Sequence, residues 1–128
     1  MNIIKAAIIA IILILTLWLT GFAVVPPDII GTWLGKTEVP DQGPDELTLV
    51  FVKGEEGFSG TLVDTLGLIA KDTAVKDIKI QDNDLTFHFP LVDGMEISVK
   101  MAVDGNMMKG AWTTPEGDMG TLVFERKK

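Results

Sequence analysis

The chain has 128 residues, 47% of them hydrophobic, which is enough for one ordinary domain. Its net charge is −7, and its Lys and Arg residues are scattered except in the final RKK at 126–128. Nucleic-acid binding needs clustered basic residues, so we expect no nucleic-acid partner. It contains no cysteine, which excludes a disulfide, a thiolate metal site, a cysteine nucleophile and a lipid-modified cysteine.

Residues 6–25 form an uncharged apolar run after a single basic residue, Lys5. Gly21 and Ala23 place small residues at positions −3 and −1 of a cleavage after Ala23, which is typical of a secretory signal peptide. An uncleaved membrane anchor is the main alternative, because twenty residues rise about 30 Å as a helix and can cross a bilayer; a helix buried in the following domain is a third interpretation. With a signal or an anchor, Lys5 stays cytoplasmic.

We therefore divide the chain into a signal peptide or N-terminal membrane anchor at 1–25 and a separate domain at 26–128. That domain is expected to be exported to the periplasm or the cell exterior. In the anchored case, residues 6–25 hold it at the inner membrane, so the membrane is then a partner. Pro26 and Pro27 stiffen the connection between the two parts.

From Gly31 onward, short segments with alternating polar and apolar residues are separated by turn residues. Eight such segments are found, at 31–36, 46–53, 58–64, 75–80, 85–89, 95–103, 107–114 and 120–127. The stretch 65–73 fits a loop or half a turn of helix, and 41–46 (DQGPDE) is predicted to be loop. The regular spacing predicts an all-β fold, an antiparallel up-and-down (meander) eight-stranded β-barrel preceded by an N-terminal hydrophobic helix.

Alternation assigns one apolar face of each strand to the barrel interior. The clearest segment is 95–103, in which every second residue from Met95 to Val103 is apolar. The other predicted inward residues are Leu47, Leu49, Phe51, Phe58, Gly60, Leu62, Ile78, Ile80, Leu85, Phe87, Phe89, Met108, Gly110, Trp112, Leu122 and Phe124. At the two glycines the missing side chain permits strong bending or close backbone approach.

Three residues at the ends of the domain form a recognisable combination. Gly31 and Trp33 begin the first strand in GTWLG, and Arg126 ends the last strand in GTLVFER. This combination resembles lipocalin and calycin-like barrels, and more closely the compact bacterial lipocalin-like modules that open with GTWxG and carry FSG and KGAW. The resemblance implies that the tryptophan packs at the closed end of the barrel under a basic residue. A guanidinium over an indole is worth about 0.5–2 kcal/mol.

No residues in the sequence form a recognisable catalytic or metal site. His88 is the only histidine and is predicted to face outward, so a zinc site has no second histidine. Neither Ser59 nor Ser98 lies in a Gly-x-Ser-x-Gly motif. Residues 82–84 (DND) lack the glycine and distal glutamate of a helix-loop-helix calcium loop. We expect no enzyme activity, no metal and no cofactor.

An eight-stranded barrel can be filled by side chains or can hold one small ligand. The first hypothesis is an exported lipocalin-like barrel that binds a small apolar ligand or lipid chain. The predicted ligand contacts are Phe51, Phe58, Phe87, Phe89, Met95, Met101, Met108 and Trp112, because aromatic rings and adaptable methionines suit irregular apolar ligands. The alternative is a non-enzymatic structural or protein-interaction module of the cell envelope with a filled core and an unspecified partner. It remains open because tyrosine, and with it the family's Thr-Asp-Tyr and Arg-x-Tyr motifs, is absent.

Overall fold

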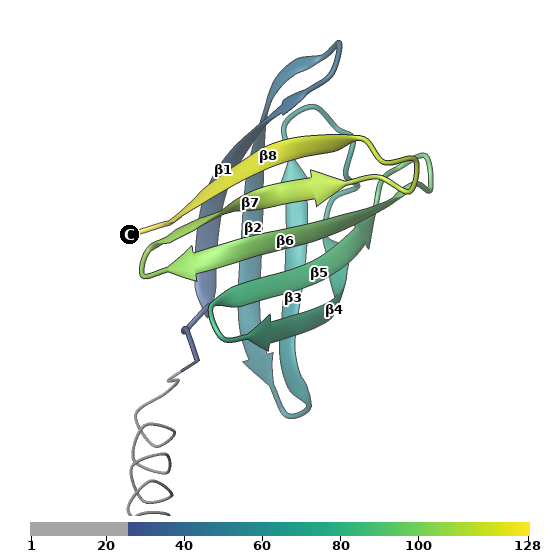
Figure 1. Cartoon of the computed structure of the whole chain (residues 1–128). Helices are drawn as coiled ribbons and strands as arrows, with labels where there is room; N and C mark the ends of the chain where they lie inside the picture. The colour runs from purple at the N-terminus through teal and green to yellow at the C-terminus, as the bar shows by residue number, and fades with distance from the viewer. Residues whose placement is uncertain (1–25) are drawn as a thin grey trace, which may run out of the picture.

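The computed structural model describes residues 26–128, which form one closed barrel of eight antiparallel strands (Figure 1). Each strand pairs with the next, and β8 pairs with β1. The predicted meander of eight strands is therefore confirmed. The strands are β1 (Gly31–Val39), β2 (Gly43–Gly54), β3 (Gly57–Asp64), β4 (Thr73–Gln81), β5 (Asp84–Pro90), β6 (Glu96–Asp104), β7 (Met107–Thr113) and β8 (Met119–Arg126).

The hydrophobic helix, signal peptide or anchor predicted for residues 1–25 lies outside the described residues. Within 26–128, no helix is long and apolar enough to cross a bilayer. The stretch 65–72, left between loop and helix by the sequence, forms a helix-free connection between β3 and β4.

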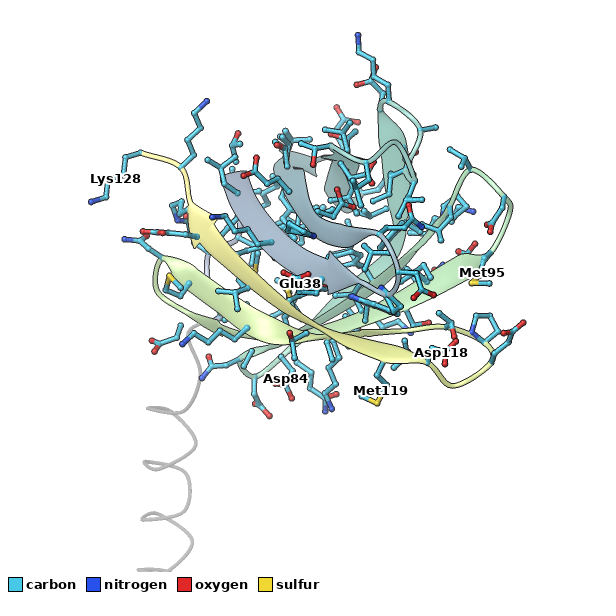
Figure 2. All side chains as sticks on the ribbon, turned by 90° about the horizontal axis from the view of Figure 1, so that it is seen from above. Glu38, Asp84, Met95, Asp118, Met119 and Lys128 are labelled. Carbon is cyan, nitrogen blue, oxygen red and sulfur yellow. The ribbon has the colours of Figure 1, made fainter. Side chains whose placement is uncertain are left out.

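The meander gives the barrel two ends with different connections. The start of β1 and the end of β8 meet at one end, together with the tight turns that follow β2, β4 and β6; we call this the closed end. The connections 40–42, 65–72, 91–95 and 114–118 meet at the other end, which we call the cavity end. Met95 and Asp118 lie on one side of the view in Figure 2 and Lys128 on the other.

The closed end is packed around Trp33, whose side chain is 0% exposed. Its indole Nε1 donates a hydrogen bond to the carbonyl oxygen of Ile29 at 2.9 Å. The Cζ atom of Arg126 lies 4.2 Å from the centre of the indole ring, in a cation–π arrangement. The stacking implied by the resemblance is thus present, and Gly31 starts β1 beside it with φ +129°, a backbone conformation that favours glycine.

Arg126 also ties together three segments that are distant in sequence. Its Nη1 and Nη2 atoms donate to the carbonyl oxygens of Ile30 and Asp28, and its Nε atom donates to Oδ1 of Asn106 at 3.1 Å. Because Arg126 pairs directly with Trp33 in the β1–β8 ladder, one side chain fixes the lead-in to β1, the ring beneath it and the β6–β7 turn.

A β-bulge in β4 changes which residues face the interior. The register of β4 against β5 shifts between Lys76 and Lys79, and Asp77 has φ +52°. One extra residue in a strand reverses the alternation beyond it. Val75 is buried, and Ile78 also packs against the core. In a regular strand, residues three positions apart would face opposite sides of the sheet. The bulge leaves Asp77 on the outer surface.

Phe58 was expected inside the barrel, and that prediction is wrong. Its side chain is 38% exposed. It pairs with Lys53 near the tip of the β2–β3 hairpin, whereas β3 pairs with β4 only at Gly60–Leu62. The tip of this hairpin projects past the neighbouring strands in Figure 1. Alternation alone does not show where a strand extends beyond the barrel wall. It therefore assigns Phe58 to the interior, although β3 has a neighbour in β4 only from Gly60 onward.

Gly110→Ala should destabilise the barrel strongly, because a Cβ at this position would lie 2.0 Å from the carbonyl oxygen of Lys100 and 2.6 Å from the Cα of Met101. These are backbone atoms, so β6 or β7 must move. We expect the free energy of unfolding in urea to fall by about 1–3 kcal/mol or more. Gly54→Ala is the control, because its Cβ would meet only the Gly57 carbonyl oxygen at an ordinary 3.5 Å. Equal losses for both variants would contradict this account.

Candidate functional site

An apolar cavity of about 140 Å³ lies in the half of the barrel away from Trp33. Its wall is formed by inward side chains of the strands, among them Leu47, Leu62, Phe87, Val99, Leu122 and Phe124. Asp45 is the only ionisable residue in its lining. The closed half is filled by Trp33, Phe51, Met101 and Met108, which are almost fully buried. The void therefore occupies the cavity end and does not extend through the barrel.

Three of the four connections at the cavity end contribute to the rim of this cavity, and the last residue of β1 contributes beside the fourth. Val39 ends β1, Leu68 and Ile69 belong to the β3–β4 connection, Leu91 begins the β5–β6 connection and Thr114 begins the β7–β8 connection. Ile69 is buried and joins the hydrophobic core. The 65–72 connection thus places apolar side chains over the cavity.

Trp112 closes another part of the rim. It is half-buried, and its indole Nε1 donates to Oγ1 of Thr37 at 2.9 Å. The Thr37 hydroxyl donates in turn to the carbonyl oxygen of Thr121 at 2.7 Å. These bonds across β7, β1 and β8 hold the ring at the rim, where the indole presents an apolar surface and leaves its N–H satisfied.

Asp45 is a buried carboxyl in the wall of the cavity, and its side chain is only 2% exposed. Its Oδ1 atom accepts hydrogen bonds from the backbone N–H groups of Thr65 and Leu66 and from the Thr65 hydroxyl, at 3.0–3.2 Å. Burial and the neighbouring carboxyl of Asp64 raise the pKa of Asp45 above its ordinary value of 3.8. Buried charges need such partners, since an unpaired one is costly.

Asp64 holds the next part of the same connection. Its Oδ2 accepts from the N–H of Leu68 at 3.1 Å and its Oδ1 from the N–H of Ile69 at 3.0 Å. Together the two carboxyl groups accept hydrogen bonds from four of the five backbone N–H groups between Thr65 and Ile69, all except that of Gly67. The polar pair therefore positions Leu68 and Ile69, the apolar side chains that cover the cavity.

Sequence reasoning missed this carboxyl pair, because 41–46 was predicted to be loop and β2 in fact begins at Gly43. The alternation itself carried the information. Asp45 has the same parity as Leu47 and Leu49, and Asp64 the same parity as Leu62, so both project from inward faces. Asp64 pairs with Leu47 in the ladder. Extending each inward face by one position would have placed two acids at the cavity rim.

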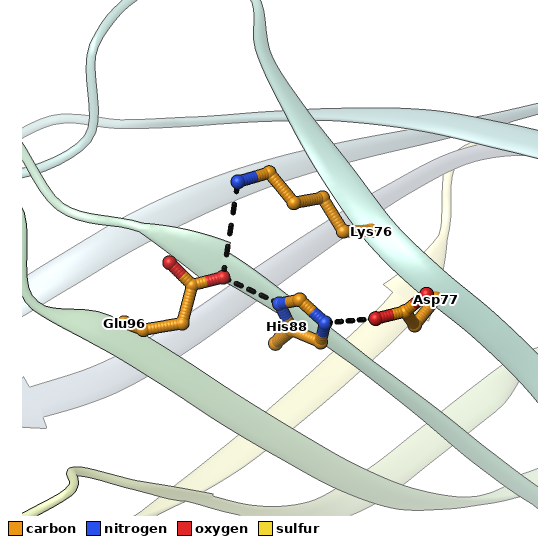
Figure 3. Close-up of polar contacts among 4 residues, drawn as sticks. All are labelled: Lys76, Asp77, His88 and Glu96. Carbon is orange, nitrogen blue, oxygen red and sulfur yellow. Dashed lines mark hydrogen bonds and ion pairs between the residues drawn. The ribbon is translucent and has the colours of Figure 1, made fainter.

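A second polar cluster lies on the outer surface of β4, β5 and β6 (Figure 3). The predicted outward His88 lies between two carboxylates: its Nδ1 contacts Glu96 and its Nε2 contacts Asp77. Lys76 adds an ion pair to Glu96 at 4.0 Å. The hydrogen bonds with Asp77 and then Glu96 raise the pKa of His88 above 6.5, and the bond from His88 lowers the pKa of Asp77.

The engagement of both ring nitrogens limits what His88 can do. A general base needs a free nitrogen lone pair, and both His88 nitrogens face carboxylates. Within residues 26–128, no group of three or more histidine, aspartate or glutamate side chains has a geometry that could hold a metal ion. The cluster is suited to bridging three strands rather than to chemistry.

The predicted ligand contacts fall into several groups. Phe87, Phe89 and Trp112 line the cavity. Phe51, Met101 and Met108 are buried but belong to the filled half and lie outside the cavity lining. Met95 is half-buried against the core in the β5–β6 connection. Phe58 lies on the outside, as described above.

Comparison with known proteins identifies the fold and no close relative. No protein-family model and no curated protein matches the chain. A redesigned β-barrel matches with a TM-score of 0.61 and 15% identity, over 78% of this chain and 92% of that one. Secretory abundant heat soluble protein 4 from Ramazzottius varieornatus matches with a TM-score of 0.47 and 12% identity, over 77% of this chain and 94% of that one. The first likeness shows a shared barrel fold alone.

Two substitutions of Asp45 should separate the contribution of its hydrogen bonds to stability from the contribution of its charge. Asp45→Asn keeps an acceptor oxygen for Thr65 and Leu66 and can donate an N–H to Asp64, so at pH 7 the free energy of unfolding should be unchanged or higher. Asp45→Ala removes the acceptor of the Leu66 N–H and one of the two acceptors of the Thr65 N–H, which also bonds to the Glu46 carbonyl oxygen, and should lower it by about 1–3 kcal/mol. Urea unfolding measures both, and an Asn variant as damaged as the Ala variant would contradict this account.

The stability of Asp45→Asn and that of the unmodified chain should depend differently on pH. A carboxyl with a raised pKa in the folded state contributes stability that is present below its unfolded pKa of about 3.8 and is lost as the pH rises through the folded pKa. The difference in stability between Asp45→Asn and the unmodified chain should therefore grow in favour of the variant as the pH rises from 4 to 7.

His88 can be titrated alone, because it is the only histidine. An NMR titration of its imidazole should give a pKa above 6.5, and Asp77→Asn or Glu96→Gln should each lower that pKa, since each removes one carboxylate. The stability contributed by the charged ring is present below pH 6.5 and is lost as the pH rises through the raised pKa. A pKa at or below 6.5 would overturn the account of the cluster.

Proposed function

We propose that this chain is an exported, non-enzymatic, lipocalin-like binding protein whose cavity holds a small apolar ligand or one end of a lipid chain. The observation that carries the proposal is the cavity of about 140 Å³ in an otherwise well-packed barrel. It favours this function over the alternative of a filled barrel that acts only as a structural or protein-interaction module. Export is supported by the charge-free run at 6–25, after Lys5.

The cavity size limits the ligand. An engineered protein cavity of about 150 Å³ lined by Leu, Ile and Phe binds benzene, so the present cavity suits one six-membered ring or a short alkyl segment. A longer chain would have to leave through the rim between the connections. Burying each CH₂ is worth about 0.8 kcal/mol, and much of that is offset by the cost of association. We therefore expect millimolar to high-micromolar affinity for six-carbon ligands, about −4 to −6 kcal/mol.

Leu62→Phe should weaken benzene binding because Leu62 lines the cavity and a phenyl ring there would occupy it. Val63→Phe is the matched control, since Val63 is the next residue and its side chain faces outward, 37% exposed. Benzene binding is measured by NMR shifts of the methyl groups of Leu, Ile and Val. The unmodified chain and Val63→Phe should bind benzene alike, and Leu62→Phe at least about tenfold more weakly.

Two results would contradict the proposal. One is the absence of methyl shifts in the unmodified chain near benzene saturation. The other is equal binding by Leu62→Phe, with circular dichroism showing that both variants are folded.

A further inference from the structure

The chemistry of the rim narrows the class of ligand beyond "small and apolar". The charged residues of the four connections at the cavity end are mostly acidic: Asp41, Asp72, Asp93, Glu116 and Asp118. Lys71 is the only basic residue in these four connections, at 40–42, 65–72, 91–95 and 114–118. Any ligand that passes between them enters a region of negative potential.

The cavity wall itself is almost entirely apolar. Of the residues that line it, Asp45 alone can ionise, and no lysine, arginine or histidine is among them. Asp45 is 2% exposed and Asp64 lies beside it. An anionic head group drawn to this end would lose water and find like charges, whereas an ammonium group would find carboxylates at the rim and one carboxyl in the wall.

We infer that the ligand of this cavity is a short apolar molecule with a cationic amine head, and that carboxylate-headed ligands such as fatty acids are selected against. The inference rests on the proposed function, because it concerns the head group of a ligand whose apolar part fills the cavity. The apolar part provides most of the affinity, and the acidic rim sets the preference between heads of opposite charge.

Three ligands with six carbon atoms each differ in the charge of the head group: hexylamine, 1-hexanol and hexanoate, whose sixth carbon is the carboxylate carbon. We expect the full-length protein at pH 7 and low salt, followed by NMR methyl shifts, to bind hexylamine about tenfold more tightly than hexanoate, with hexanol between them. The preference should shrink at about 0.5 M salt, because exposed charges are screened over a few ångströms there.

Charge reversal at the two ends of the barrel provides a matched control. Glu116→Lys with Asp118→Lys changes the β7–β8 connection at the cavity end, and Glu55→Lys with Glu56→Lys changes the β2–β3 turn at the closed end by the same total charge. The first double variant should lose most of the preference for hexylamine over hexanoate, while the second should keep it. All four residues are exposed, so neither variant disturbs the core.

Asp45→Asn tests the carboxyl in the wall. It should weaken hexylamine binding about threefold or more relative to any change in hexanol binding.

The outcomes distinguish the two levels of the proposal. If hexanol binds but hexanoate binds as tightly as hexylamine, the inference is overturned and the proposed function stands. If both double variants lower the preference equally, the effect comes from the overall charge and the inference is also overturned. If none of the three ligands binds, the proposed function fails and the inference fails with it.

Discussion

The barrel depends on the contact between Arg126 and Trp33, where the last strand meets the first. A meander of eight strands becomes closed only if β8 pairs with β1, and that ladder is short, from Trp33–Arg126 to Lys36–Val123. The guanidinium stacks on the indole and also binds the lead-in residues Asp28 and Ile30. Closure therefore combines burial of a large ring, charge-assisted hydrogen bonds and strand pairing in one place.

The barrel interior has one filled half and one half with a cavity, because the two ends are built differently. Large side chains, Trp33, Phe51 and Met108 among them, fill the closed end, where the turns are tight. At the other end a longer connection follows β3. Asp45 and Asp64 accept hydrogen bonds from four of its backbone N–H groups, and the Thr65 N–H also bonds to the Glu46 carbonyl oxygen of β2. Polar groups that satisfy the backbone of this connection allow its apolar side chains to cover a void without unpaired N–H groups.

Alternation predicted the strands and the inner faces well, because burial on one side of a sheet imposes a period of two. It failed where local geometry broke that period or where the wall ended. Because of the bulge at Asp77, Val75 and Ile78 both contact the core. Phe58 lies on a hairpin tip that extends beyond the barrel wall. The cavity could not be predicted from the sequence, since whether inward side chains fill a barrel depends on how their volumes fit in three dimensions. The acids at 45 and 64 were overlooked because 41–46 was predicted to be loop and the inward faces were not extended to charged positions, which are rarely buried.

Residues 26–30 and the last residues of the chain both lie at the closed end, bound to each other through Arg126. A fusion tag, a purification handle or a sensor chip attached next to Lys128 would thus hold the molecule by its closed end. The mouth would then point into the surrounding medium, with its exchange of small molecules unobstructed by the attachment.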